Sequence, residues 1–328
     1  MKKSYPFISI LRVLAMISIV AGHLCSYFDV YLYDLGGVGV EIFLAISGYL
    51  YGQRLIKYKA KWLYGRLMRI MIPVWIWTVF LFLLGSIIDK PHFDLLPCLI
   101  GVQGTGFLTP FNLPIYRAMS HTWFVTTILI CYLFTLVLCN EKGLSFVDKY
   151  KWQITIMSCI AQIILARIGF QIGYFIIFFT GFIIARLGKS DISKRALLSF
   201  IAMFILGATR ILLHGLENWF YNSVIAIWSA GAIGIFSLCF FEWLGTKWSA
   251  SVEKIANLAV WKYLDKVSYP IYIVHYCFLH GFLDVANMAV NPMLQLLLCL
   301  VLTGFSAAVL EKTTEIVRKR RDDLIKTN

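Results

Sequence analysis

The hydrophobic pattern divides the chain into long apolar stretches separated by short polar or charged breaks. A helix that crosses a bilayer needs about 20 consecutive, mostly apolar residues, and stretches of this kind recur along the chain. Ten helices are expected, at residues 7–28, 36–53, 70–89, 121–140, 152–169, 171–186, 196–213, 220–242, 268–288 and 292–311. The pattern therefore predicts an all-α integral membrane protein with about ten transmembrane helices.

The positive charges indicate how these helices are oriented. Most of the 30 Lys and Arg residues fall in alternate loops, starting with Lys2 and Lys3, whereas the outer loop over residues 90–120 holds few. Positively charged loops stay in the cytosol, so both termini are expected there. We expect a single transmembrane domain over residues 1–312 and a short basic cytosolic tail over residues 313–328.

Composition supports this class and excludes others. The chain is 60% hydrophobic and 14% charged, far more apolar than a soluble domain. Its net charge of +13 comes from loops beside membrane helices, which favours contact with anionic lipids over binding of nucleic acid. The eight cysteines include no CxxC pair and are expected to be small core residues, so no metal site is predicted.

The first apolar segment carries two ionisable residues, Arg12 and His23. They lie eleven residues apart, so a helix places them on nearly the same face. The segment lacks a small-residue cleavage site and is not expected to be a cleaved signal peptide. Ionisable groups in a membrane core are costly and usually serve a partner, a cavity or a reaction.

Glu41 in the second segment is expected at a depth similar to that of His23, because the two segments form an antiparallel hairpin. A carboxylate facing an imidazole would hold one tautomer and raise its basicity, as a general base requires. The alternative is an ion pair that only packs the two helices together.

Arg66 and Arg69 share one face at the start of the third segment, three residues apart and before Pro73. Paired guanidinium groups suit a diphosphate because their planar forks bind phosphate oxygens. Arginines at a cytosolic helix end are equally common as membrane anchors.

Two further polar patterns follow. His121 and Trp123 begin the fourth segment and form either a sugar-facing rim or an interfacial anchor. Ser268, Tyr272 and His275 recur at helical spacing in the ninth segment. Such a stripe lines a cavity or joins helices by hydrogen bonds.

Together these residues resemble the membrane acyltransferase 3 family. The resemblance covers nearly the whole chain and rests on five motifs in order: Arg12-x10-His23, the stretch from Gly37 through Glu41 to Tyr49, Arg66-x-x-Arg69 with Pro73, His121-x-Trp123, and Ser268-Tyr-x-x-Tyr272-x-x-His275. Two departures are that Ile42-Phe43 replaces the usual double phenylalanine and that residues 142–266 show no family motif.

The resemblance implies a bacterial inner- or plasma-membrane enzyme that moves an acyl group, usually acetyl from acetyl-CoA, to a hydroxyl of a carbohydrate or glycolipid of the envelope. It implies essential roles for Arg12 and His23, and places Arg66 and Arg69 on the CoA side. Polysaccharide-biosynthesis proteins are possible partners. Some relatives carry an extracytoplasmic esterase-like domain, which is not expected here.

In the mechanism that we expect, CoA lies at the cytosolic mouth, and its pantetheine arm passes Tyr272 and His275 to reach His23. The helix rise from Arg12 to His23, about 16 Å, is comparable to this arm. His23 would deprotonate the acceptor hydroxyl or take up the acyl group itself, while Arg12 would steady the oxyanion or bind CoA. The alternatives are a proton-coupled transporter or lipid-linked sugar flippase, and a non-catalytic assembly subunit.

Overall fold

The computed structural model describes residues 5–30, 35–88, 95–111, 113, 117–188, 191–214 and 218–327, and within them every regular element is helical. The α-helices are α1 (Pro6–Tyr27), α2 (Leu35–Gly52), α3 (Lys59–Ile87), α4 (Leu96–Ile100), α5 (Thr105–Leu108), α6 (Trp123–Leu138), α7 (Glu141–Ala166), α8 (Gly173–Arg186), α9 (Ile192–Leu212), α10 (Ala226–Lys247), α11 (Ser249–Asn257), α12 (Ala259–Val274) and α13 (Pro292–Thr327). Shorter 3-10 or π turns are η1 (Arg117–Thr122), η2 (Tyr221–Ile225), η3 (His275–Phe278) and η4 (Val285–Asn287).

Six helical stretches in the described chain are long and apolar enough to cross a membrane. They are Pro6–Tyr27, Lys59–Ile87, Arg117–Leu138, Ile192–Leu212, Tyr221–Lys247 and Pro292–Asp323. Two shorter apolar helices, Val38–Gly52 and Gly173–Arg186, lie beside them in the bundle. The protein is therefore an all-helical, multi-pass membrane protein. Helices can span lipid because they satisfy their own backbone hydrogen bonds. The count of ten spans and the cytosolic position of both termini stay predictions.

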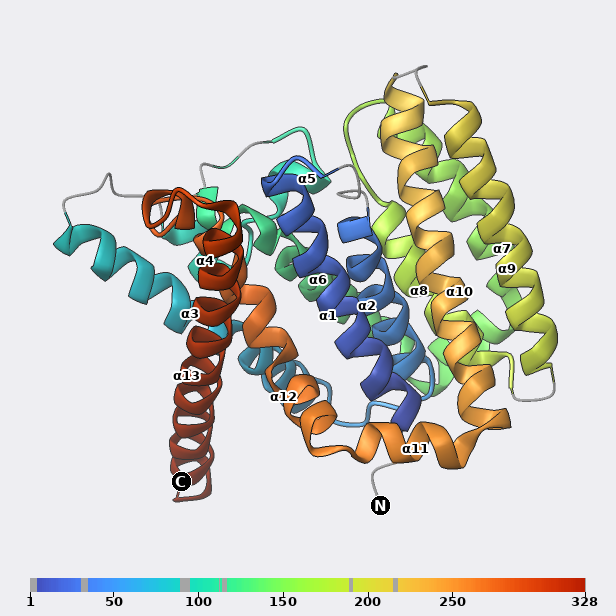
Figure 1. The fold of residues 1–328 in the computed structure, drawn as a ribbon. Coiled ribbons are helices and arrows are strands. Elements are labelled where there is room, and N and C mark those ends of the chain that lie inside the picture. Colours follow the sequence, from blue (N-terminus) through green and yellow to red (C-terminus); the bar gives the residue numbers. More distant parts are fainter. Residues whose placement is uncertain are drawn as a thin grey trace.

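The helices are arranged around α1 and α2, which lie side by side at the centre of the bundle (Figure 1). Helices α7 to α10 cover one side of this pair, and α2 packs most closely against α8. On the other side, α12 lies against α1, and α3 and α13 lie farther out. The short α11 runs across the end of the bundle where α1 begins, so it connects α10 to α12 around that end (Figure 1).

The close approach of α2 and α8 depends on glycines. A Cβ atom at Gly48 would overlap the carbonyl oxygen of Phe178 on α8, and one at Gly181 would overlap the carbonyl oxygen of Ala45 on α2. Small residues at membrane helix interfaces let backbones approach closely where lipid provides no hydrophobic drive for association. The two helices therefore meet backbone to backbone.

Gly48→Ala is expected to destabilise the protein by about 1–3 kcal/mol, because the added methyl group must push α2 away from the backbone of α8. Thermal denaturation in lipid nanodiscs measures this loss as a lower melting temperature. Gly65→Ala on α3 is the matched control, since a Cβ atom there meets no heavy atom within 4 Å. Equal melting temperatures for the two variants would contradict the backbone contact.

The predicted continuous helix over residues 268–288 is wrong. Helix α12 ends at Val274 and gives way to η3, a turn and η4. Gly281 adopts a φ of 103°, which a continuing helix cannot contain, and Asp284 accepts a hydrogen bond at 2.8 Å from the backbone N–H of Ala286. This turn chemistry ends the helix within an apolar stretch.

Two helices extend beyond their predicted spans. Helix α3 begins at Lys59, eleven residues before the predicted start, and α13 continues through the basic segment after residue 312. Charged residues are good helix formers, so an apolar window marks the membrane part of a helix rather than its ends. In the predicted outer loop, α4, α5 and η1 occupy the described part, whereas residues 89–94, 112 and 114–116 lie outside the described chain, as do Lys2 and Lys3.

Candidate functional site

Two polar contacts join α1 to α12, one toward each end of the helix pair. Arg12 donates a hydrogen bond from Nη2 to Asp265 Oδ2 at 2.8 Å. Eleven residues further along α1, His23 Nδ1 lies 2.7 Å from Nε2 of His275, the residue that follows α12. At 1.5 Å per residue, the ten residues from Asp265 to His275 place the two contacts about 15 Å apart. The two helices therefore run in the same direction and are joined at two levels.

The second contact belongs to a group of three histidines, which we call the histidine cluster: His23, His121 and His275. The rings of His23 and His275 are stacked with their centroids 5.0 Å apart, and His121 meets His275 edge-on at 5.0 Å. Tyr276 lies between them, 4.9 Å from His23 and 4.8 Å from His121. His275 and His121 are buried, whereas His23 is partly exposed and is therefore the most accessible member of the cluster.

The hydrogen bonds assign the protons of the cluster. His275 Nδ1 lies 2.9 Å from the carbonyl oxygen of Tyr272 and 3.1 Å from that of Ile271. A carbonyl oxygen only accepts, so Nδ1 of a neutral His275 carries the proton and its Nε2 is an acceptor. His23 then donates from Nδ1 to that atom, which leaves the lone pair on His23 Nε2. The arrangement presents His23 as a base.

His121 is held by the backbone of α12 rather than exposed at a rim. Its Nε2 lies 2.8 Å from the carbonyl oxygen of Tyr272, and the Tyr272 hydroxyl donates to the carbonyl oxygen of His121 at 2.5 Å. These reciprocal bonds fix η1 against α12. Only 5% of His121 is exposed, so the residue does not lie at an open rim, and a role of His121 in substrate binding stays a prediction.

The ring of Trp123 packs outside the histidine cluster. Its indole stacks on Phe107 of α5 at 5.4 Å and meets Tyr174 of α8 at 4.7 Å. The backbone of Trp123 also lies close to Gly104. These contacts anchor the α4–α5 segment to the bundle, and a role of Trp123 in substrate binding stays a prediction.

Glu41 does not form the predicted pair with His23. It is buried, its backbone packs against Gly234 of α10, and its Oε2 has no hydrogen-bond partner among the described residues. In the described residues His23 uses Nδ1 for His275 instead. Similar depth in a hairpin does not fix the direction in which a side chain points, and α2 packs against α8 and α10 as well as α1. His275 therefore occupies the position that was expected of Glu41.

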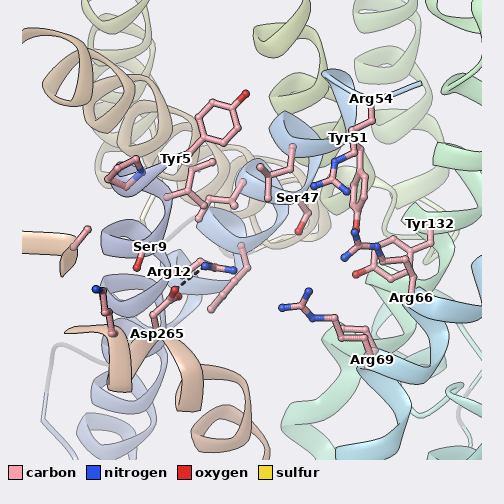
Figure 2. A pocket seen from close by; sticks show the side chains of 18 of the residues that line it. Tyr5, Ser9, Arg12, Ser47, Tyr51, Arg54, Arg66, Arg69, Tyr132 and Asp265 are labelled. Atoms are coloured by element: carbon pink, nitrogen blue, oxygen red, sulfur yellow. Dashed lines mark hydrogen bonds and ion pairs between the residues drawn. The ribbon is translucent and has the colours of Figure 1, made fainter. Parts of the chain in front are cut away.

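A cavity of about 570 Å³ opens at the other contact between α1 and α12. We call it the arginine cavity, because Arg12, Arg54, Arg66 and Arg69 line it together with Asp265. Figure 2 shows Arg12 beside Asp265 on one wall and Arg69 reaching into the same space from the opposite wall. The guanidinium carbons of Arg54 and Arg66 lie 5.8 and 5.5 Å from the ring centre of Tyr51. The predicted pair on α3 thus lines a real cavity.

Helices α1 and α12 both lead from the arginine cavity to the histidine cluster. Arg12 and Asp265 lie at the cavity, and His23 and His275 follow on the same two helices. Of the predicted site residues, Arg12, Arg66 and Arg69 therefore meet at one end. His23, His121, Tyr272 and His275 meet at the other.

Sequence reasoning missed three residues of these two groups. Asp265 falls between the predicted helices at residues 220–242 and 268–288, although its spacing of three from Ser268 and ten from His275 places it on the polar stripe. Arg54 falls between the predicted helices at residues 36–53 and 70–89, among several other Lys and Arg residues that carry no distinguishing pattern. Tyr276, directly after His275, carries no spacing signal that distinguishes it from the aromatic residues around it.

In the described part of the chain no group of three or more His, Cys, Asp or Glu side chains is arranged to hold a metal ion. The polar groups that remain are guanidinium groups at one end of α1 and imidazoles at the other. This arrangement can bind an anion and, about 15 Å away, accept a proton.

Comparison with known proteins identifies the family. Residues 5–311 match the acyltransferase 3 family (Acyl_transf_3), described as an acyltransferase domain. No curated protein and no solved structure matches the chain. The match spans nearly all of the helical bundle, including the arginine cavity and the histidine cluster. The chain therefore belongs to the acyltransferase 3 family.

Proposed function

We propose that this membrane acyltransferase takes an acyl group, in the first instance acetyl, from acyl-CoA and transfers it to a hydroxyl group of an envelope or exported polysaccharide or glycolipid. The observation that carries the proposal is the placement of a cationic cavity and a histidine base on the same two helices, about 15 Å apart. An extended pantetheine arm is of comparable length, so a donor held by its phosphates in the cavity brings its thioester to His23.

The donor end rests on Arg66 and Arg69. Both line the arginine cavity, and neither guanidinium group takes part in an ion pair among the described residues, although the Glu311 carboxylate acts on Arg69 at longer range. Guanidinium groups bind phosphate oxygens through paired N–H donors, which suits the diphosphate of CoA. Arg12, by contrast, already has Asp265 as its counter-ion, so we assign it to the wall along which the arm passes.

The transfer step rests on His23. Its Nε2 takes the proton of the acceptor hydroxyl while the oxygen attacks the thioester carbonyl. The C–S bond then breaks, the acyl group stays on the acceptor oxygen, and the CoA thiolate leaves and takes up a proton. His275 Nε2 accepts a hydrogen bond from His23 Nδ1 throughout and steadies the imidazolium that forms.

The acceptor is proposed to approach from the end of α1 that lies away from the arginine cavity. His280 lies there, 4.5 Å from Tyr276 and 6.1 Å from Tyr27, and the Tyr27 hydroxyl donates to Asp284 Oδ1 at 2.6 Å. Aromatic rings with hydroxyl, imidazole and carboxylate groups are suited to a polyhydroxylated ligand. This end connects to the cluster through Tyr276.

Acetyl-CoA binding tests the donor assignment. The wild type in lipid nanodiscs is expected to bind acetyl-CoA in calorimetry, and Arg66→Ala/Arg69→Ala is expected to weaken binding by at least about tenfold, because charge-assisted hydrogen bonds to phosphate are lost. Lys319→Ala/Arg320→Ala removes the same charge from an exposed part of α13 and serves as the control.

A wild type that binds none of acetyl-CoA, succinyl-CoA and CoA would refute the donor assignment. Equal loss of affinity in the double variant and in its control would show that only long-range charge matters. Absence of binding would move the proton-coupled transporter to first place as an explanation of the buried ionisable residues.

A further inference from the structure

We propose that Arg54 binds the ribose 3′-phosphate of the donor. The arginine cavity would then distinguish CoA from 3′-dephospho-CoA by this contact. This inference rests on the proposed use of acyl-CoA and goes beyond it, because it divides the cavity into two anion subsites. One is formed by Arg69 with Arg66, and the other by Arg54 with Arg66 at the ring of Tyr51.

The charge of the cavity is larger than a diphosphate requires. Arg12 is compensated by Asp265, and Lys262 and Glu253, which also line the cavity, have opposite charges. Among the described residues that line the cavity, Arg54, Arg66 and Arg69 then remain as an excess of positive charge. A diphosphate ester carries about two negative charges, and a phosphate monoester adds about 1.5 to 2 more. The excess fits a ligand that presents both groups.

The positions of the side chains separate the pair Arg54 and Arg66 from the third arginine, Arg69. Arg54 and Arg66 both place their guanidinium carbons within 6 Å of the Tyr51 ring centre, at 5.8 and 5.5 Å. Arg69 lies almost one turn further along α3, and Figure 2 shows its guanidinium group in a different part of the cavity. Two anionic groups of one ligand can therefore occupy the cavity at the same time.

The Tyr51 ring is a fixed platform for the pair. Only 5% of Tyr51 is exposed, and its ring meets Trp62 at 5.4 Å and Tyr132 at 5.5 Å. Each guanidinium group gains a cation–π contact, but two like charges at one ring repel each other. An anion bound between them removes this repulsion, which favours a phosphate at this position.

Arg54 is placed at the mouth of the cavity. It follows α2 in the connection to α3, where its backbone N–H donates to the carbonyl oxygen of Tyr51 at 3.0 Å, and its side chain is exposed. Arg66 is half-buried beside it. In CoA the 3′-phosphate lies at the adenosine end, opposite the thioester. A donor whose thioester reaches toward His23 therefore leaves its adenosine end at the mouth.

Calorimetry in nanodiscs with CoA and 3′-dephospho-CoA tests the assignment on wild type, Arg54→Gln and Arg69→Gln. Wild type is expected to prefer CoA by about tenfold or more, as charge-assisted hydrogen bonds to one phosphate allow. Arg54→Gln is expected to remove this preference by weakening only CoA binding. Arg69→Gln, the matched control in the same cavity, is expected to weaken both ligands and keep the preference.

Other outcomes overturn the inference in distinguishable ways. A wild type that binds both ligands equally, or an Arg54→Gln variant that weakens both alike, refutes the 3′-phosphate assignment while acyl-CoA remains the donor. A wild type that binds neither ligand refutes the proposed function as well. Because Arg54 is exposed, Arg54→Gln is expected to keep the wild-type melting temperature, and Arg54→Lys is expected to retain part of the preference through its charge.

Discussion

His23→Ala is expected to reduce the rate of acyl transfer by about a thousandfold, the scale on which a positioned general base contributes. The variant removes the Nε2 atom that takes the acceptor proton in the proposed mechanism, but it leaves the arginine cavity about 15 Å away unchanged. Acetyl-CoA affinity should therefore stay at the wild-type value while turnover is lost. The measurement is acyl transfer by the purified protein in nanodiscs, beside calorimetry on the same sample.

The control for this variant is His214→Ala, which removes an exposed histidine at the end of α9. It should keep wild-type turnover. Normal acyl transfer by a folded His23→Ala protein would refute the mechanism, since the structure offers His23 as the partly exposed member of the cluster. Loss of both turnover and CoA binding would instead indicate that His23 is needed for the structure of the site.

His275→Ala is expected to give the second-largest effect, a fall in kcat of about a hundredfold with little change in KM for acyl-CoA. His275 is a positioning residue, because it acts on the reaction only by accepting the hydrogen bond from His23 Nδ1. Without this acceptor the His23 ring is free to turn, and its imidazolium loses a stabilising partner.

His275→Gln is the conservative variant, because the side-chain amide oxygen of Gln can approach the position of Nε2. It should recover part of the lost kcat. A merely structural histidine would behave otherwise, with KM and melting temperature changing together with kcat and with no recovery by Gln. The split between kcat and KM, measured over a range of acetyl-CoA concentrations, decides between the two roles.

The elements of the fold were largely predictable because each membrane helix needs its own apolar stretch. The ends of the helices were not predictable, because α3 and α13 continue into charged sequence and α12 ends inside an apolar stretch. Gly281 and Asp284, which form the turn after α12, are residue types that are common in turns. Their effect depended on the backbone conformation, which no apolar window reports.

The sequence predicted at which level along the helices the site residues lie, but not which neighbouring helix each side chain faces. Arg12 and His23 on one stripe correctly indicated a polar face of α1, and Arg66 and Arg69 do line the arginine cavity. The partner of His23 was not predictable, because helix spacing within α1 does not show which neighbouring helix faces that stripe. Glu41 and His275 were both available, and the packing of α2 against Gly234 of α10 turns Glu41 away.

The two contacts between α1 and α12 fix the position of these helices relative to each other, and so the distance between the arginine cavity and the histidine cluster. With Arg12 bound to Asp265 and His23 bound to His275, neither helix can slide or rotate past the other without breaking a contact. One residue inserted between Arg12 and His23 would turn the imidazole by about 100° and raise it by about 1.5 Å. The number of residues between Arg12 and His23 is therefore constrained together with the identity of these two residues.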